Sequence, residues 1–270
     1  VLKLVGAEAT RAEARLVWEP VVAGDAAGPL VADALRAGET VGVALMEPEQ
    51  VSLFDNAVTG AFATSRGTAV LVGDEALALF SQVVREGSFA VLDAKEAVHR
   101  VFPADTSLPA LVTADDLAAM DAFDLGLAGY VLNSSVSAYT LEALMEAHGG
   151  GALPEAEGDE ARAAVAAAAA RHLVEPLRAA MEREGSLKAY RDIDLPLVGV
   201  LACMERVGAA IDVPLLEQLG REAQAEVDAL TEEIQELAGE PFNVSSPKQL
   251  ARILFEVLQL PPVKKNQRGY

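Results

Sequence analysis

The sequence contains few of the residues that most often carry metal or redox chemistry. It has one cysteine, three histidines and one tryptophan among its 270 residues. The single cysteine, Cys203, excludes an internal disulfide and fits a reducing compartment, so we expect a cytoplasmic protein. The histidines, His99, His148 and His172, lack the spacing and the cysteine partners of a zinc site. These absences exclude a disulfide-stapled scaffold and a zinc site of the usual pattern.

Long apolar runs and phosphate-binding loops are also missing. Although 51% of the residues are hydrophobic, no apolar run reaches the ~20 residues of a membrane span. A secretory leader, a Walker loop, a dinucleotide-binding glycine turn and a nucleophile elbow are all absent from the sequence. The chain starts at Val1 rather than at methionine and stops at Tyr270. We therefore expect a fragment of a longer protein that has no membrane partner.

Positive charge is scarce except in one stretch. The chain has 21 basic and 41 acidic residues, a formal net charge of −20. Residues 242–270 contain five basic residues and one glutamate, so their net charge is +4. A basic segment on an acidic body predicts contact with a polyanion through that segment alone. The acidity of the remaining residues argues against broad DNA binding by the rest of the chain.

The basic stretch has the signals of a capped helix followed by a polar loop. Ser246 is a good N-cap, Pro247 fits the first helical position, and Gln249 predicts a capping box. A helix N-terminus offers free N–H groups to an anion, and Lys248 lies in that first turn. Apolar residues then recur at helical spacing until two prolines end the pattern. An ordinary capped surface helix would give the same signals.

The order and spacing of residues in this stretch resemble the thumb of bacterial DNA polymerase I. The matching residues are Phe242 to Leu250 (FNVSSPKQL), Ile253 to Phe255 (ILF), Leu260-Pro261, Lys264-Lys265 and Gly269-Tyr270. Upstream, other residues resemble the segment that opens that family's polymerase domain: Leu195 to Val198 (LPLV), Met204-Glu205, Gly208, Ile211-Asp212 and Leu237 to Glu240 (LAGE). The resemblance implies sequence-independent contacts with the phosphates of duplex primer–template DNA through Asn243, Ser245, Ser246, Lys248, Lys264, Lys265, Asn266 and Arg268.

The first 186 residues predict strands followed by helices. Short apolar segments predict strands at residues 16–18, 40–46, 51–54, 61–64, 68–72 and 89–92, and turn residues bound those at 51–54, 61–64 and 68–72. Helical patterns cover residues 29–37, 74–86, 95–101, 114–120, 124–132, 140–147 and 159–183. Several strands in sequence suggest a meander, and helices on its faces make this an α/β protein with a mixed sheet. Almost pure alanine at residues 161–170 predicts a helix that packs closely but weakly.

Two further helices, at residues 189–207 and 213–238, are predicted after the sheet region. In the second helix, Asp212 is the expected N-cap and Gly239 the expected stop. An antiparallel pair of helices topped by a basic tip is how the thumb of the family looks. We therefore predict two domains: an exonuclease-like domain over residues 1–186, and the start of the polymerase domain, an all-α thumb hairpin, over residues 187–270.

The first domain resembles the 3′–5′ exonuclease domain of the same family, which has a ribonuclease H-like fold. The resemblance is looser here and is carried by Phe123-Asp124, Tyr130 to Asn133 (YVLN), Leu141 and Leu144. Nucleases of this kind use two metal ions held by converging carboxylates. The family's motifs for those ligands are Asp-x-Glu on the first strand, Asn-x-x-x-Asp on a helix, and Tyr-x-x-x-Asp on a later helix.

All three metal-binding motifs are missing from this sequence. The first strand, residues 41–46, reads VGVALM and has no carboxylate before Glu47. The best match to the second motif runs from Asp93 to Ala97, so alanine replaces the aspartate, and the third falls near residues 165–169, without tyrosine or aspartate. Alanine and valine side chains offer no oxygen to a hard cation. We predict an exonuclease-like domain without nuclease activity and without a metal site.

The resemblance implies a DNA-directed DNA polymerase, a nucleotidyltransferase of DNA replication and repair, as the parent protein. The family's polymerase carboxylates lie in the palm, which would follow Tyr270, so we expect no catalytic residue and no cofactor in this chain. Magnesium is expected for the parent polymerase, and the rest of the polymerase chain is an expected partner. Whether the chain alone is an enzyme stays open.

Two other functions remain compatible with the sequence. The domain could be an active 3′–5′ exonuclease with non-standard ligands, for which Asp115, Asp116, Asp121 and Asp124 are the candidates. It could instead be a structural or protein-docking module that supports the polymerase. A large exposed apolar patch on the sheet domain would favour the second possibility.

Overall fold

The computed structural model describes residues 21–47 and 57–261, which form two compact units. We call residues 1–208 the sheet unit and residues 209–270 the helical unit, and describe each by itself. The strands predicted at residues 16–18 and 51–54 lie outside the described residues.

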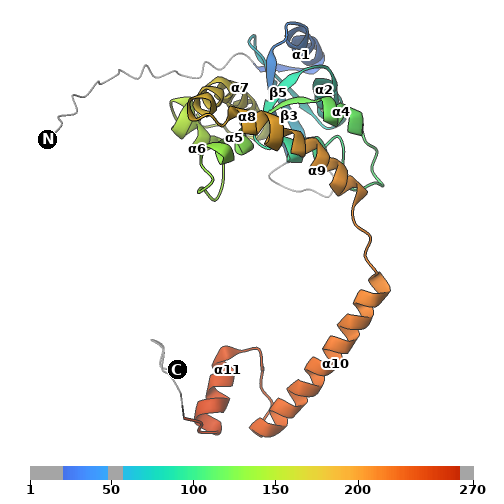
Figure 1. The fold of residues 1–270 in the computed structure, drawn as a ribbon, viewed down its shortest axis with the longest axis vertical. Helices are drawn as coiled ribbons and strands as arrows, with labels where there is room; N and C mark the ends of the chain where they lie inside the picture. Colours follow the sequence, from blue (N-terminus) through green and yellow to red (C-terminus); the bar gives the residue numbers. More distant parts are fainter. Residues whose placement is uncertain (1–20, 48–56, 262–270) are drawn as a thin grey trace, which may run out of the picture. The chain divides into compact units, whose positions relative to one another are not determined.

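The sheet unit is built on a mixed sheet of six strands, in the order β1-β4-β3-β2-β5-β6 (Figure 1). Antiparallel pairing of β2 with β3 and of β3 with β4 confirms the predicted meander. The pairs β2–β5, β5–β6 and β1–β4 are parallel. The strands are β1 (Val21–Ala23), β2 (Thr40–Met46), β3 (Thr59–Ala63), β4 (Thr68–Val72), β5 (Ser88–Val91) and β6 (Asp121–Asp124). The α/β class is confirmed.

One face of the sheet is covered by the long alanine-rich helix α7 (Asp159–Glu184). Small residues meet on both sides of this contact, where alanines of α7 pack on Ala44, Ala61 and Ala63 of the sheet. The approach is closest at Gly42 of β2, where an added Cβ would lie 2.0 Å from the carbonyl oxygen of Ala167. The close packing expected of an alanine-rich helix is therefore observed, and it depends on a residue without a side chain.

The opposite face carries the larger apolar core. Because successive residues of a strand point to opposite faces, Val41 and Val43 of β2 pack on this side. Phe80 of α2 and Phe89 of β5 meet edge to face, with ring centroids 5.5 Å apart. The other described helices of the sheet unit are α1 (Ala27–Arg36), α2 (Asp74–Glu86), α3 (Ala94–His99), α4 (Ala114–Ala119), α5 (Leu125–Leu132), α6 (Leu141–Leu144), α8 (Leu187–Ala189) and α9 (Leu195–Val207).

Two short strands were not predicted from the sequence. The edge strand β1 has three residues, and β6 has only Ala122 and Phe123 between two aspartates. Asp124 ends β6 and is also the N-cap of α5, because its side chain accepts a hydrogen bond from the backbone N–H of Leu127. The helix signal at Asp124 was therefore correct, and it concealed the strand before it.

The helical unit consists of α10 (Val213–Ala238), α11 (Pro247–Arg252) and a π-helical turn (Ile253–Val257). The predicted bounds of α10 are confirmed. The Asp212 side chain accepts from the N–H of Leu215, and Gly239 has a φ of 75° at the C-terminal end. A small core of Ala238, Phe242 and Ile253 joins the end of α10 to the π-helical turn. Among the described helices, none is both long and apolar enough to cross a membrane.

The two compact units divide after Gly208, whereas the predicted domain boundary lies at residues 186/187. The difference arises from α8, a π-helical turn (Tyr190–Asp194) and α9, which follow the predicted boundary. Val198 and Ala202 of α9 are buried in the main core of the sheet unit. The predicted boundary was placed by the resemblance to a polymerase. By its packing, α9 belongs to the sheet unit.

Candidate functional site

The three segments that were compared with the metal-binding motifs meet at one small pocket of the sheet unit. The pocket has a volume of about 140 Å³. Its walls include Ala44 of β2, Ala97 of α3 and Ala166 of α7, one residue from each segment, with Leu141 of α6 beside them. The meeting follows from the sheet order, since β2 and β5 are neighbours, α3 follows β5, and α7 lies across β2. The side chains of Ala44, Ala97 and Ala166 at this meeting point are aliphatic.

The carboxylates near this pocket have other partners. Asp93, which lines the pocket, caps α3 by accepting the N–H of Glu96 at 2.8 Å. Arg100 also lines the pocket, and its guanidinium lies 2.5 Å from a Glu47 oxygen and 3.5 Å from a Glu96 oxygen. The hydrogen bond from Arg100 lowers the pKa of Glu47 below its usual value. At this pocket, an arginine lies beside the carboxylates that could otherwise attract a cation.

Within residues 21–47 and 57–261, no three His, Cys, Asp or Glu side chains form a group that could hold a metal ion. Two-metal hydrolysis needs several carboxylate oxygens converging on ions roughly 3.5–4 Å apart. Ala44, Ala97 and Ala166, where the three segments meet, supply no side-chain oxygen. The residues of these two ranges therefore do not fit the metal centre that the fold family implies.

The four aspartates considered as substitute ligands are not brought together. Asp116 accepts hydrogen bonds from both the N–H and the hydroxyl of Thr113, in the capping box of α4. Asp115 is exposed in the same helical turn, and Asp121 is exposed at the start of β6. Asp124 is buried, and its side chain is used to cap two helices. Asp116 and Asp124 are therefore used as helix caps, and Asp115 and Asp121 face solvent.

Asp124 forms a buried polar junction that the sequence did not reveal. Its two carboxylate oxygens accept the N–H groups of Ala94, at the start of α3, and of Leu127, in α5, at 2.8 and 2.7 Å. The hydroxyl of Tyr190 accepts the N–H of Asp124 at 2.8 Å and donates to its carbonyl at 3.1 Å. Burial raises the pKa of Asp124 to about 6, although its hydrogen bonds act in the opposite direction. Nothing in the local sequence signalled Tyr190, which lies 66 residues away.

In the helical unit, the described half of the predicted DNA-binding set forms a compact turn before α11. Asn243 organises it, with its side-chain oxygen accepting the N–H of Ser245 at 3.0 Å and its carbonyl accepting the N–H of Ser246 at 3.0 Å. Asn243, Ser245 and Lys248 are exposed, and Ser246 is half-buried. The turn therefore presents an ammonium group and polar atoms to solvent. Lys264, Lys265, Asn266 and Arg268 lie outside the described residues.

The capping of α11 differs in one respect from the prediction. Ser246 is the N-cap, and its hydroxyl accepts the N–H of Gln249 at 3.5 Å, as predicted. The side chain of Gln249, however, accepts the N–H of Asn243 at 2.9 Å. In a capping box, the Gln249 side chain would instead accept the N–H of Ser246. Here it bonds Asn243 and closes the turn. This contact joins Asn243 to the first turn of α11.

Comparison with known proteins identifies relatives over much of the chain. Residues 213–270 match the family described as DNA polymerase family A. DNA polymerase I of Geobacillus stearothermophilus is 37% identical over 163 residues, which are 55% of this chain and 19% of that protein. DNA polymerase I of Lactococcus lactis subsp. lactis is 53% identical over 79 residues, 29% of this chain and 9% of that protein. The chain spans about a fifth or less of these relatives.

A solved structure shares the fold. It is described as the POL domain of Pol1 from M. smegmatis in complex with DNA primer-template and dNTP. The match covers 93% of this chain and 43% of that chain, with a TM-score of 0.65 and 23% sequence identity. At that identity the likeness concerns the fold, and it agrees with an α/β unit followed by long helices.

Proposed function

We propose, from the premise that this chain represents part of a bacterial DNA polymerase I of family A, that it supplies two non-catalytic parts of such an enzyme. The first part is an exonuclease-like unit without nuclease activity. The second is a thumb segment that holds duplex primer–template DNA by its phosphates. Template-directed DNA synthesis itself would be carried out by residues that this chain does not contain.

The observation that carries the first part is the composition of the pocket where the three motif segments meet. Ala44, Ala97 and Ala166 line it, and Arg100 lies beside Glu47 and Glu96. A metal-dependent nuclease must activate water and stabilise the leaving oxygen with its ions. Among the described residues, none of those that line this pocket belongs to a group that could hold the ions, so no bound ion would serve either step there. The guanidinium of Arg100 cannot act as the base that takes a proton from water, because arginine stays protonated.

The direct test is degradation of a 5′-labelled single-stranded oligonucleotide by the chain in Mg²⁺ or Mn²⁺. We expect no shortening above the buffer background. Shortening that disappears with EDTA would contradict the proposal. The variants Asp93→Asn and Glu96→Gln then serve as controls, because they remove the two carboxylates that line the pocket. Activity unchanged in both variants would have to come from another site.

The second part rests on the polar turn before α11 and on the charge of residues 242–270. Lys248 and Asn243 are exposed at this turn, and the segment carries a net charge of +4 in a chain of net charge −20. Binding by phosphate contacts is insensitive to base sequence and falls steeply with salt. The proposed partner is therefore a primer–template duplex of any base sequence, bound through its backbone phosphates.

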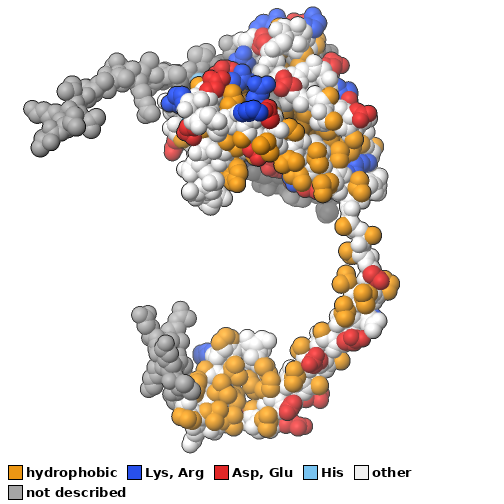
Figure 2. Space-filling model, viewed as in Figure 1, with side chains coloured by type: hydrophobic (Ala, Val, Ile, Leu, Met, Phe, Trp, Pro, Cys, Tyr) orange, Lys and Arg blue, Asp and Glu red, His pale blue; other side chains and the backbone are white. Residues whose placement is uncertain are grey.

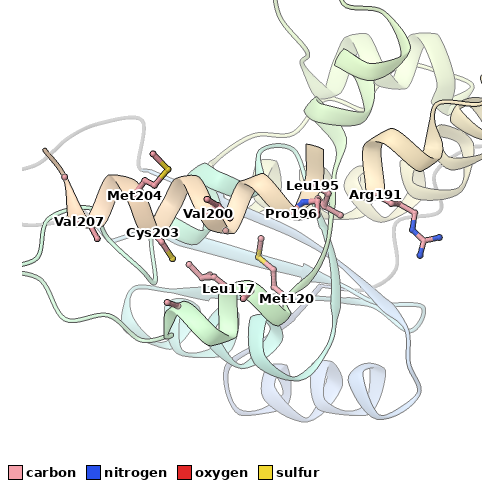
Figure 3. Close-up of a pocket in the computed structure, with 13 residues that line it drawn as sticks. Leu117, Met120, Arg191, Leu195, Pro196, Val200, Cys203, Met204 and Val207 are labelled. Atoms are coloured by element: carbon pink, nitrogen blue, oxygen red, sulfur yellow. The ribbon is translucent and has the colours of Figure 1, made fainter. Parts of the chain in front are cut away.

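Structural support of the polymerase is a second candidate function for the sheet unit, compatible with the first. It is favoured by a groove of about 850 Å³ between α4 and α9, whose walls are mainly apolar (Figure 3). Figure 2 shows hydrophobic side chains gathered over α9. Val200 and Met204 are large hydrophobic residues that stay more than half exposed there. Exposed apolar surface of this kind is typical of a surface that other protein covers.

A further inference from the structure

Helix α9 connects two parts of the chain that the sequence assigns to different domains. It contains residues that resemble the opening of the polymerase domain, yet one face of it is part of the core of the sheet unit. Ala202 is fully buried and Val198 is 6% exposed, both within the core that includes β2, β3 and α2. At Gly199 an added Cβ would lie 2.9 Å from the carbonyl oxygen of Leu117, so α4 and α9 are in close contact.

Two consecutive side chains anchor the C-terminal end of α9. The Glu205 oxygens lie 2.6 Å from Lys95 Nζ and 2.5 Å from His99 Nε2, both on α3. The hydrogen bond from Lys95, followed by that from His99, lowers the pKa of Glu205. Arg206 donates to the carbonyl oxygens of Pro103 and Leu108, and its guanidinium lies 5.0 Å from the ring centroid of Phe102. These contacts attach the helix to α3 and to the loop that follows it.

A third anchor holds the segment before α9. Tyr190 lies in the π-helical turn between α8 and α9, and it is 1% exposed. Its hydroxyl bonds both backbone groups of Asp124, the residue whose carboxylate caps α3 and α5. Pro196 lacks the N–H that would continue regular helical bonding across this point, which accounts for a π-helical turn directly before it. The turn directs Tyr190 into the core while the helix continues.

We propose that α9 is the attachment by which the sheet unit holds the polymerase part of the chain, with Tyr190, Glu205 and Arg206 as its anchoring residues. This inference rests on the proposed function, because it explains why a unit without metal ligands is retained. The opening helix of the polymerase region is part of that unit's core, so removing residues 1–186 would expose Val198 and Ala202. The exonuclease-like unit then serves to anchor the polymerase part of the chain. It does so through the contacts of α9 with α3 and α4.

Hydrogen exchange in the 270-residue chain tests which unit α9 belongs to. Val83→Ala weakens the core on α2, a different element from α9 in the same cluster. We expect this variant to speed amide exchange in α9 and in β2 and β3 by similar factors, and to leave α10 unchanged, because residues of one cooperative unit open together. If exchange became faster in β2 and β3 but stayed unchanged in α9, as in α10, the inference would be overturned.

The single thiol of the chain gives a second measurement. Cys203 lies on α9, half-buried against the core and facing the groove with α4 (Figure 3). We expect Glu205→Gln combined with Tyr190→Phe to raise the rate of reaction with a disulfide reagent by roughly fivefold. The control Glu217→Gln removes a carboxylate from the exposed face of α10 and should leave the rate unchanged. A rate unchanged in the double variant would contradict the role of the anchoring residues.

The two proposals fail in different ways. If the chain degraded DNA or did not bind duplex, the proposed function would be wrong, while the exchange and thiol results would still report the attachment of α9. If α9 exchanged with α10, the attachment would be wrong and the nuclease assay would be unaffected.

Discussion

At the scale of single residues, Asp124 shows how a buried carboxylate can serve the structure by capping two helices. Each of its oxygens accepts a backbone N–H from a different helix, which an asparagine with a single acceptor oxygen cannot do. The same burial that makes these bonds strong disfavours the negative charge, and it raises the pKa to about 6 from an ordinary value of 3.8. Stability therefore depends on the protonation of this residue.

The Asp124→Asn variant should reveal this pH dependence. Because the pKa in the folded protein is above the unfolded value, the folded state binds the proton more tightly, and this contribution is lost as pH rises through about 6. We expect the stability of the wild type minus that of the variant to decrease by roughly 1–3 kcal/mol between pH 4 and pH 7. Urea denaturation at several pH values measures it, with the exposed Asp121→Asn as control. A difference that stays constant over this range would contradict the assignment.

Gly42 is a second important residue, because there is no room for a side chain at its position. We expect Gly42→Ala to destabilise the sheet unit by about 1–3 kcal/mol or more, because the new Cβ would lie 2.0 Å from the carbonyl oxygen of Ala167. Gly28→Ala is the matched control, since nothing lies within 4 Å of a Cβ there and alanine favours the helix. Thermal unfolding followed by circular dichroism compares the two variants. Equal melting temperatures would mean that α7 can move away from β2 without cost.

At the scale of elements, the sequence predicts the helices and strands that have clear local signals, such as capping residues or an apolar run. The bounds of α10 were predicted because Asp212 and Gly239 mark its ends, and those of β2 because its residues form an apolar run. The strand β6 was missed because Asp124, its last residue, was read as the start of a helix. The pocket could be predicted only in part. Each motif segment was identified singly, but the meeting of Leu141 and Arg100 with them depends on sheet order, which local signals do not contain.

The cap of α11 gives a prediction at this scale. Ser246→Ala removes the hydroxyl that accepts the N–H of Gln249, and should destabilise the helical unit locally by about 1 kcal/mol. Ser245→Ala is the control, because the bond at this residue is donated by its backbone N–H, which alanine keeps. Faster amide exchange in α11 for the first variant alone is the expected result. Similar exchange in both variants would show that the cap does not hold the helix.

At the scale of the whole molecule, positive charge is concentrated in residues 242–270, which carry +4 in a chain of net charge −20. We expect neutralising Lys264, Lys265 and Arg268 to weaken duplex binding and to reduce the slope of log affinity against log salt by about 2–3, at ~0.9 for each phosphate that is no longer neutralised. Fluorescence anisotropy with a labelled duplex measures both effects. The control variant neutralises Arg36, Arg66 and Lys188 of the sheet unit, which changes the net charge equally. An unchanged slope in the first variant would refute contact through the basic segment.

The close approach of Gly42 to α7 also limits which sequences the sheet unit can tolerate. Main-chain atoms set the spacing between helix and sheet there, and no side chain fits between them. Any substitution at position 42 would therefore be felt first as damage to folding, whatever else it changed.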